Sequence, residues 1–560
     1  MRFIPATILA ITCAAGLSHA ENKPPKPNII VILADDMGFS DLGCYGGEIE
    51  TPHLDGLANN GLRFTQFYNA ARCCPTRASL LTGLYPHQAG IGGMTRNQRL
   101  PGYRGDLNRE CVTLAEALRP AGYRTYMTGK WHVTASEYEH AIEGSRDNWP
   151  LQRGFDRFFG TLSGGGSFFD PATLTRDNEL IPPDENFYYT DAIGENAATF
   201  IAEHDRDHPF FMYVAFTAPH WPLHAKPQDI EKYAGRYDVG WDVLRQQRYR
   251  RQVEMGLIDP DWPLSPLASG KPALGNSEAA RPWQDVEDKA FQAKLMEVYA
   301  AMVDSMDQAI GRIVAELQTT GQFDNTLILF LSDNGAESQD VFFRKGVIDQ
   351  PLGSDDIQLD LVPKFTRTGL PLRTGPGVIP GPADTYAAYG LPWANLSNTP
   401  FRYFKCFTHE GGIATPLIAH WPAGIRRRGE WERQPGHIID IMATSIDLAG
   451  AEYPDRFNGH AIQPMEGCSL VPAFTGRTIQ RDAPLVWEHL GNRALRRGDW
   501  KIVARGTRGT WELYNLKEDR TELINLADQH PERVAAMAGE WTKQAHRTRI
   551  LPWPYGPAPE

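Results

Sequence analysis

Three short apolar segments, each followed by polar residues, constrain the fold of this chain more than any other feature. They span residues 28–33 (NIIVIL), 210–216 and 326–331 (TLILFL). Continuous apolar runs of this length are typical of strands buried on both faces of a parallel sheet. The polar residues that follow them are Asp35 and Asp36, His220, and Asp333 and Asn334. Because the carboxyl ends of parallel strands meet at one edge, we expect these side chains to lie close together.

Helical patterns separate these strands. Thr113 and Glu116 have the spacing of a capping box and predict a short helix that ends at Gly122. From Leu295 to Leu317 apolar residues recur at helical spacing and predict a long amphipathic helix. A further strand is expected over 124–128. This alternation predicts an α/β fold with a large, mostly parallel sheet sandwiched by helices.

The second half of the chain changes in character. Residues 351–400 contain eight Pro and six Gly without periodicity, which predicts a long loop, and loops of this length are usually functional. Beyond Pro484, the closely spaced segments LVWEHL, WKIVA and WELYNL predict short strands, and a helical stretch begins at about Glu532. We therefore predict a catalytic domain over 21–470 and a small C-terminal subdomain over 471–560, with an antiparallel sheet and a packing helix.

The first twenty residues have the composition of a secretory signal. Arg2 precedes an apolar stretch that ends at Leu17, and small residues precede the expected cleavage after Ala20. This predicts a periplasmic or secreted protein. An uncleaved anchoring helix and a lipid anchor on Cys13 are the alternatives. No later stretch approaches the roughly 20 apolar residues that span a bilayer, so no transmembrane segment is expected in the mature chain.

Composition and cysteine spacing narrow the function classes. The 560 residues are 42% hydrophobic and 22% charged, as in globular proteins. The net charge of −12 gives no support for a nucleic-acid partner, which would favour clustered basic residues. Seven cysteines in so long a chain do not form a disulfide framework, and no pair has zinc-finger spacing. The adjacent pair Cys73 and Cys74 is the exception that needs an explanation.

The segment Cys73-Cys74-Pro75-Thr76-Arg77-Ala78-Ser79-Leu80-Leu81-Thr82-Gly83 matches the pattern C-x-P-[ST]-R-x-x-x-L-T-G. It resembles the signature of type I sulfatases of the alkaline phosphatase superfamily, whose cysteine is oxidised to formylglycine by a dedicated maturation enzyme. Only Cys73 has Pro at +2 and Arg at +4, so the resemblance assigns the conversion to Cys73. We expect Thr76 and the apolar residues after it to open a helix whose N-terminus favours an anion.

The acidic residues at the strand ends predict a metal site. Asp35, Asp36, Asp333 and Asn334 offer only oxygen ligands, which suit Ca²⁺ first and Mg²⁺ second and disfavour zinc. In the family that this chain resembles, the equivalent residues hold such an ion together with an oxygen of the formylglycine at position 73.

Three further segments resemble sulfatase motifs in family order. They are G-K-W-H at 129–132, P-H-x-P at 219–222 and K-x-x-x-x-E-G-G at 405–412. The resemblance implies that Lys130, His220 and Lys405 bind the substrate and that these residues, Arg77 and His132 belong to the catalytic set. An alkaline-phosphatase-like fold is also implied.

The resemblance also implies a mechanism. One hydroxyl of the formylglycine hydrate at position 73 is deprotonated toward Asp333 and attacks sulfur, while His220 or Lys405 protonates the leaving oxygen. The second hydroxyl then gives its proton to His132, and sulfate is expelled. Lys130 and Arg77 are cationic partners for the sulfate and for the hydrate, respectively.

The substrate class follows less directly. Segments 151–163, 170–174 and 392–402 look like those of long bacterial arylsulfatases, and Trp221, Trp393 and Phe407 are expected near the mouth of the site. An aryl sulfate is therefore the first prediction. The alternatives are a sulfated glycan, a phosphonate monoester or phosphodiester, and a non-catalytic protein that keeps Cys73 as a thiol.

Overall fold

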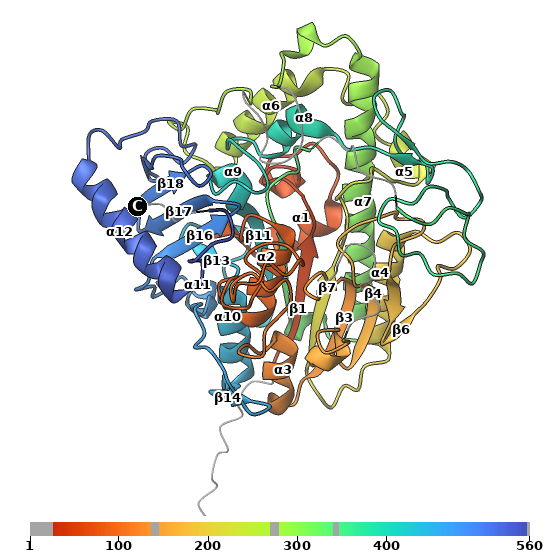
Figure 1. The fold of residues 1–560 in the computed structure, drawn as a ribbon, viewed down its shortest axis with the longest axis horizontal. Helices are drawn as coiled ribbons and strands as arrows, with labels where there is room; N and C mark the ends of the chain where they lie inside the picture. The colour runs from red at the N-terminus through yellow and green to blue at the C-terminus, as the bar shows by residue number, and fades with distance from the viewer. Residues whose placement is uncertain (1–25, 136–144, 269–278, 340–345, 557–560) are drawn as a thin grey trace, which may run out of the picture.

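A computed structural model of the chain describes residues 26–135, 145–268, 279–339 and 346–556. The predicted signal segment 1–20 and Cys13 lie outside these residues. One large sheet forms the centre of the molecule (Figure 1). Its path is β12 (Glu430–Glu432), β2 (Leu62–Tyr68), β11 (Ala414–His420), β8 (Thr326–Ser332), β1 (Asn28–Ala34), β7 (Phe210–Ala215), β3 (Arg124–Lys130), β4 (Arg157–Thr161), β5 (Leu174–Arg176) and β6 (Glu179–Leu180), with β13 (Gly436–His437) beside β2.

The three predicted apolar strands are adjacent at the centre of this sheet. β1 pairs in parallel with β7 on one side and with β8 on the other, so that Ile30 lies between Met212 and Ile328. Only β11, β5 and β6 run antiparallel to their neighbours in the sheet. The prediction of a mostly parallel sheet, with the strand ends at one edge, is confirmed.

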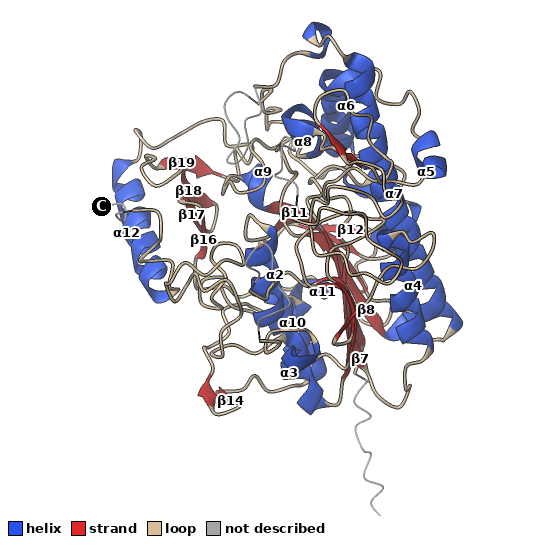
Figure 2. Cartoon of the chain, turned by 45° about the vertical axis from the view of Figure 1, so that its right-hand side comes forward, coloured by secondary structure: helices blue, strands red, loops and turns tan. Residues whose placement is uncertain are grey.

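Both faces of β1 are buried, each in its own hydrophobic core. Ile30 and Ile32 pack in the core beneath α4 (Tyr189–Ala202) and α7 (Lys289–Thr319). Ile29, Val31 and Leu33 pack in the core on the other face, beneath the helices α2 (Cys73–Thr82), α3 (Leu114–Leu118) and α10 (Asp440–Ala449). Figure 2 shows helices on both sides of the sheet. A strand with two buried faces requires the continuous apolar run that the sequence displays.

The two predicted helices are present. The side chain of Thr113 accepts a hydrogen bond from the Glu116 amide at 3.1 Å, and Glu116 accepts one from the Thr113 amide, which completes the capping box of α3. A short 3₁₀ turn continues α3 to Gly122, whose φ of 92° ends it. The long helix α7 begins at Lys289, six residues before the predicted start, because Asp288 caps its first turn.

Residues 351–400 are not entirely a loop. They contain the short strands β9 (Arg373–Thr374) and β10 (Thr385–Tyr386) and the helix α8 (Gly390–Ser397). Seven of the eight residues of α8 are buried, so the helix has no polar face and leaves no amphipathic pattern in the sequence.

The C-terminal region forms the predicted antiparallel sheet with a helix. Its strands are β16 (Leu485–His489), β17 (Asn492–Arg497), β18 (Trp500–Ala504) and β19 (Glu512–Asn515), followed by α12 (Pro531–Arg547). The sequence did not predict β17, because the arginines in its segment NRALRR obscure the alternation of apolar and polar residues that is typical of a strand. Leu490 and Gly491 form the tight turn before it, both with positive φ, although leucine is not a turn signal. The predicted division at residue 470 stays a prediction.

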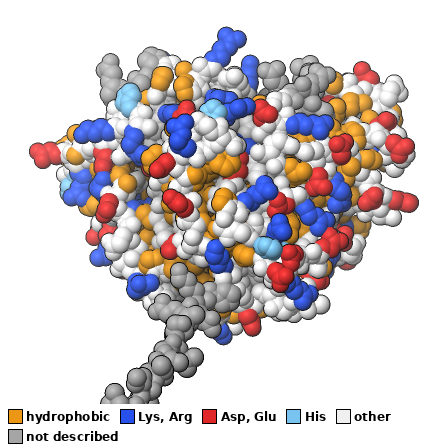
Figure 3. Space-filling model, turned by 90° about the horizontal axis from the view of Figure 1, so that it is seen from below, with side chains coloured by type: hydrophobic (Ala, Val, Ile, Leu, Met, Phe, Trp, Pro, Cys, Tyr) orange, Lys and Arg blue, Asp and Glu red, His pale blue; other side chains and the backbone are white. Residues whose placement is uncertain are grey.

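Two surface observations complete the description. None of the helices that the structure describes is long and apolar enough to cross a membrane. On the face shown in Figure 3, lysine and arginine side chains are interspersed with acidic ones and do not form a continuous basic patch.

Candidate active site

The carboxyl ends of β1 and β8 bring the predicted acidic residues together. The Asp36 amide donates a hydrogen bond to Asp333 Oδ1 at 3.2 Å, and Asn334 Nδ2 donates one to Asp36 Oδ1 at 2.6 Å. The side chains are almost completely inaccessible to solvent. Asp36 has a φ of 64°, so the chain turns sharply as it leaves β1. The predicted cluster of oxygen ligands is therefore present.

Helix α2 begins at Cys73, three residues earlier than expected. The carbonyl of Arg72 accepts the first helical hydrogen bond from the Thr76 amide at 2.9 Å. The Thr76 hydroxyl accepts a bond from the Ala70 amide instead of starting the helix. Pro75 fits the first turn, where no amide proton is needed. Cys73 consequently occupies the N-terminus of the helix itself, where the dipole favours negative charge.

The Cys73 thiol lies in a cationic environment. A hydrogen bond with Cys74 lowers its pKa well below the usual value, and Lys130 and His132 act in the same direction against the effect of burial. A low pKa makes a cysteine reactive toward oxidation. All six cysteines among the described residues are free, which agrees with the predicted absence of a disulfide framework.

Arg77 is completely buried and holds the carboxylates in place. Its guanidinium donates to Asp333 Oδ2 at 2.8 Å and lies 3.5 Å from Asp35 Oδ2. It also donates to the Lys130 carbonyl and to the Tyr213 hydroxyl at 3.0 and 3.2 Å. Tyr213 lies in the middle of the apolar strand β7, where nothing in the sequence distinguishes it from a core residue.

Lys130 is the last residue of β3, and His132 follows two residues later. Lys130 Nζ donates to Asp35 Oδ2 at 2.5 Å. His132 Nε2 lies 3.2 Å from Cys74 Sγ, and a Cβ on Gly164 would lie 2.2 Å from the imidazole, so a side chain there would displace the ring. Burial and the charge of Lys130 lower the pKa of His132 to about 4. The imidazole is therefore neutral at neutral pH and able to accept a proton.

His220 and Lys405 both face Asp36. His220 Nδ1 is 2.6 Å from the Trp221 carbonyl, which only accepts, so Nδ1 carries a proton and Nε2 faces Asp36 Oδ2 at 3.4 Å. Lys405 Nζ lies 2.7 Å from Asp36 Oδ1 and 3.0 Å from Glu337 Oε2. Burial would lower the pKa of Lys405, but these two carboxylates raise it well above its usual value. Lys405 therefore remains charged.

Glu337 was not among the predicted site residues. It lies four residues after Asp333, in the segment that leaves β8, and is buried against Lys405. The only signal for Glu337 in the sequence is its position shortly after Asp333, Asn334 and Gly335. The structure thus brings together every predicted catalytic and metal residue and adds Glu337 and Tyr213.

The charges at this edge suit a divalent cation. Lys130, His220 and Arg77 outweigh the effect of burial and lower the pKa of Asp35 to about 2, whereas burial and the charge of Asp35 raise that of Asp333 well above the usual range. Asp35 Oδ1 and Asn334 Oδ1 are buried without a hydrogen-bond partner among the described residues. Such oxygen atoms are the ligands that hard cations prefer, so the donor set fits Ca²⁺ or Mg²⁺. One oxygen each of Asp35 and Asp36 and a ring nitrogen of His220 also lie within 4.8 Å of one another.

The three aromatic residues expected at the mouth have different surroundings. Trp393 is completely buried in α8 and packs against Trp241 at 5.1 Å between ring centroids, so its predicted place at the mouth is wrong. Phe407 is buried against Tyr403 at 4.7 Å. Trp221 is partly exposed and lies 4.6 Å from the His220 ring.

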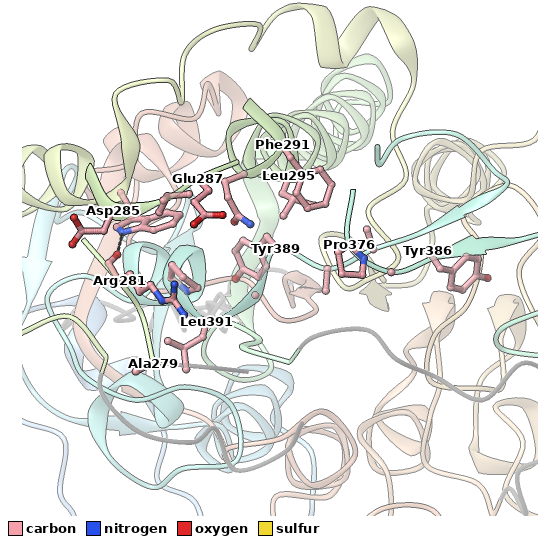
Figure 4. A pocket seen from close by; sticks show the side chains of 18 residues that line it. Ala279, Arg281, Asp285, Glu287, Phe291, Leu295, Pro376, Tyr386, Tyr389 and Leu391 are labelled. Carbon is pink, nitrogen blue, oxygen red and sulfur yellow. Dashed lines mark hydrogen bonds between the residues drawn. The ribbon is translucent and has the colours of Figure 1, made fainter. Parts of the chain in front are cut away.

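A cavity of about 420 Å³ lies elsewhere, between α7 and the segment 386–392 (Figure 4). Trp241, Phe291, Tyr389 and Leu391 contribute apolar walls. None of the candidate catalytic residues lines this cavity, so it is separate from the candidate active site.

Comparison with known proteins identifies the family. The family model described as Sulfatase matches residues 27–451. The chain belongs to the sulfatase family. A second model, described as N-sulphoglucosamine sulphohydrolase, C-terminal, matches residues 400–547. The protein is therefore a sulfuric ester hydrolase.

Individual relatives agree with this assignment. The chain is 34% identical to an uncharacterized sulfatase of Schizosaccharomyces pombe over 96% of both chains. It is 34% identical to an arylsulfatase of Klebsiella aerogenes, over 84% of this chain and 97% of the relative. Among solved structures, Ps i-CgsB in complex with k-i-k-neocarrahexaose covers 95% of this chain and 94% of its own, with a TM-score of 0.63 and 24% identity. The fold is alkaline-phosphatase-like.

Proposed function

We propose that this sulfatase hydrolyses aryl sulfate monoesters to a phenol and inorganic sulfate. The observation that carries the proposal is the position of Cys73 at the N-terminus of α2, beside the buried oxygen cluster of β1 and β8 and the cationic side chains around it. The 34% identity to an arylsulfatase supports the aryl substrate. The signal segment predicted at 1–20 favours a periplasmic or secreted location.

The cation would be held by Asp35, Asp36, Asp333 and Asn334, with Ca²⁺ favoured over Mg²⁺ and position 73 as a further ligand. When bound, it would neutralise sulfate oxygens and lower the cost of ionising the nucleophile. Arg77 keeps Asp333 oriented through its 2.8 Å bond, and Lys130 does the same for Asp35.

Position 73 would be converted from cysteine to formylglycine by a maturation enzyme, and the hydrated aldehyde supplies the attacking hydroxyl and the means of releasing sulfate. His132 is neutral and completes the cycle by accepting a proton. Its 3.2 Å contact with Cys74 orients the ring toward the start of α2.

His220 and Lys405 would act on the leaving oxygen. Both lie within 3.4 Å of an Asp36 oxygen. Lys405 remains positively charged between Asp36 and Glu337, so it stabilises negative charge there. One of the two supplies the proton that the phenolate needs.

The surroundings of His220 favour an apolar leaving group. Trp221 lies 4.6 Å from the His220 ring and, like Leu361, packs against a small buried cluster of Val362, Leu372 and Tyr386 from the long segment 351–400. An aromatic ring that stacks on Trp221 would place its ester oxygen near His220. A sulfated glycan is the second candidate, because the similar Ps i-CgsB fold was solved with a neocarrahexaose and sugar rings also stack on tryptophan.

The test is a comparison of kcat/KM for protein co-produced with a formylglycine-generating enzyme. The substrates are a nitrophenyl sulfate, the corresponding phenylphosphonate and a panel of sulfated mono- and disaccharides. The proposal predicts the highest kcat/KM for the aryl sulfate and an intact-mass change at Cys73 equal to thiol-to-aldehyde conversion. Preference for one sulfated sugar would overturn the aryl assignment, and preference for the phosphonate would overturn sulfate ester hydrolysis as the main activity.

A further inference from the structure

Arg72, the residue before Cys73, differs from the other arginines near the centre of the molecule. The fully buried guanidinium groups of Arg77, Arg248 and Arg520 each donate to a carboxylate at 2.7–2.8 Å. The Arg72 side chain instead donates to the sulfur of Cys406 at 3.2 Å, and none of the described carboxylates forms an ion pair with it. Because sulfur is a weak acceptor, most of the donor capacity of Arg72 is unused.

The place of Arg72 is fixed by its neighbours. Its carbonyl accepts the first hydrogen bond of α2, so its backbone cannot move without the helix that carries Cys73. Its side chain reaches Cys406, the residue after Lys405. Cys406 is held in turn by hydrogen bonds of its amide to the Ala71 carbonyl and of its carbonyl to Asn492. The guanidinium therefore lies on the Lys405 side of the active site, where the alcohol part of a substrate would lie.

Arg72 keeps its charge there, because a guanidinium group is not deprotonated in proteins. Its Nε atom is buried without a hydrogen-bond partner among the described residues. An arginine that is charged and has unused donors is suited to bind a planar or tetrahedral oxyanion.

We propose that Arg72 forms a subsite for a second anionic group, a carboxylate or a second sulfate, on the alcohol part of the substrate. The subsite rests on the proposed sulfatase function and specifies its substrate class. The reacting sulfate already has Lys130, Lys405 and His220 around its place, whereas Arg72 forms no ion pair with any of the described carboxylates.

The test uses pairs of aryl sulfates that differ only in one ring substituent, a carboxylate or its uncharged carboxamide, at each free ring position. A ring disulfate and the corresponding monosulfate form the second arm. We expect kcat/KM of the matured enzyme to favour the anionic member by about tenfold or more at one position. In Arg72→Gln this ratio falls toward one, mainly through KM, and in Arg72→Lys part of it is retained.

Arg109→Gln is the matched control, because it removes the same charge from an exposed pair with Asp147. Its substrate ratio should equal that of the unmodified sequence. Equal losses on both members of a pair in Arg72→Gln, or no preference for any anionic substituent in the wild type, would overturn the subsite.

Binding of the phenolic products separates failure of the subsite from failure of the proposed function. Calorimetric titration with the hydroxybenzoate isomers needs no turnover, so it reports on Arg72 even if no aryl sulfate is hydrolysed. We expect one isomer to bind about tenfold more weakly to Arg72→Gln than to wild type. Identical affinities of all isomers for the two proteins would also overturn the subsite.

Discussion

Two buried clusters of charge lie on opposite sides of β11, and they are balanced differently. In the first, at the catalytic edge, the carboxylates of Asp35, Asp36, Asp333 and Glu337 face three permanent cations, Arg77, Lys130 and Lys405. In the second, between the catalytic domain and the C-terminal sheet, Glu410 and Glu522 face Lys501 and Arg520. The first contains one more carboxylate than paired cations, whereas the second contains equal numbers of the two.

The side-chain oxygens of the two clusters also differ in how many hydrogen bonds they accept. Both carboxylate oxygens of Glu410 have donors, Lys501 at 2.9 Å on one and Arg520 and Tyr68 at 2.8 and 2.9 Å on the other. At the catalytic edge, Asp35 Oδ1 and Asn334 Oδ1 have none among the described residues. A buried carboxylate whose two oxygens both have donors, as in Glu410, fixes structure, while buried oxygens without donors are prepared to receive a cation.

The largest expected effect is at Cys73. Cys73→Ala should lower kcat by roughly 10⁴-fold or more, because a residue that supplies the nucleophile cannot be replaced by solvent. The melting temperature should stay within a few degrees of the unmodified protein, since the change removes only one small buried atom. Turnover of a nitrophenyl sulfate checks this, with Cys44→Ala as the control, because Cys44 is also a free, buried cysteine and lies outside the candidate site. Appreciable activity of Cys73→Ala would contradict the mechanism.

Removal of divalent cations should distinguish the two clusters. Chelation should lower kcat/KM by about 100-fold or more, because a metal supplies several kcal/mol of charge stabilisation. Added Ca²⁺ should restore the activity and raise the melting temperature with increasing concentration. Glu410→Gln should show the same Ca²⁺-dependent shift. The absence of such a shift in Asp36→Asn would locate the ion, and a full shift in that variant would place it elsewhere.

Glu410→Gln should instead affect stability. It leaves Lys501 and Arg520 without full compensation in a region that excludes water, so we expect a loss of about 3 kcal/mol in the free energy of unfolding. Denaturant unfolding measures it. Glu540→Gln is the control, because its pair with Arg497 is partly exposed and should contribute less than about 1 kcal/mol. Equal losses in the two variants would show that the Glu410 cluster contributes no more to the free energy of unfolding than a partly exposed ion pair does.

The effect of Glu410 should depend on pH. Burial raises its pKa, but Lys501, Arg520 and Arg496 outweigh burial and lower it from 4.5 to about 2. Stability from a carboxylate with a lowered pKa is complete above the unfolded value and is lost as the pH falls toward the folded value. The difference between wild type and Glu410→Gln should therefore be constant from pH 7 to about 5 and shrink below 4.5. A difference that grew on acidification would contradict this assignment.

The catalytic edge could be predicted from the sequence because its residues are tied to strand ends. The end of a continuous apolar run marks the end of a buried strand, and Asp35, Asp333 and His220 come soon after such runs. Cys73, Lys130, His132 and Lys405 came from the resemblance to a family, since a single side chain after a strand or before a helix carries little information by itself.

What the sequence did not predict depends on contacts between distant segments. Trp393 belongs to the core because it packs against Trp241, about 150 residues earlier, and α8 is buried on almost every side. Glu410 was recognised only as part of a motif. Its partners Lys501 and Arg520 come from the C-terminal region, and no local pattern links residues so far apart. Backbone geometry was missed where an unusual residue adopts positive φ, as Leu490 does before β17.

The smallest effect should arise at a site that belongs to neither cluster. Thr113→Ala removes the N-cap of α3 together with the hydroxyl bond to the Arg153 carbonyl at 2.7 Å, so we expect a loss of about 1 to 2 kcal/mol. Thr113→Ser keeps the capping oxygen and should recover most of that stability, which unfolding in denaturant measures. Activity and Ca²⁺ response should be unchanged in both, because α3 packs beneath the sheet on α2 and α10 and contributes no side chain to either charge cluster. A loss of turnover in Thr113→Ala would mean that the position of α2, and of Cys73 at its start, depends on the packing of α3 as well as on the charges around it.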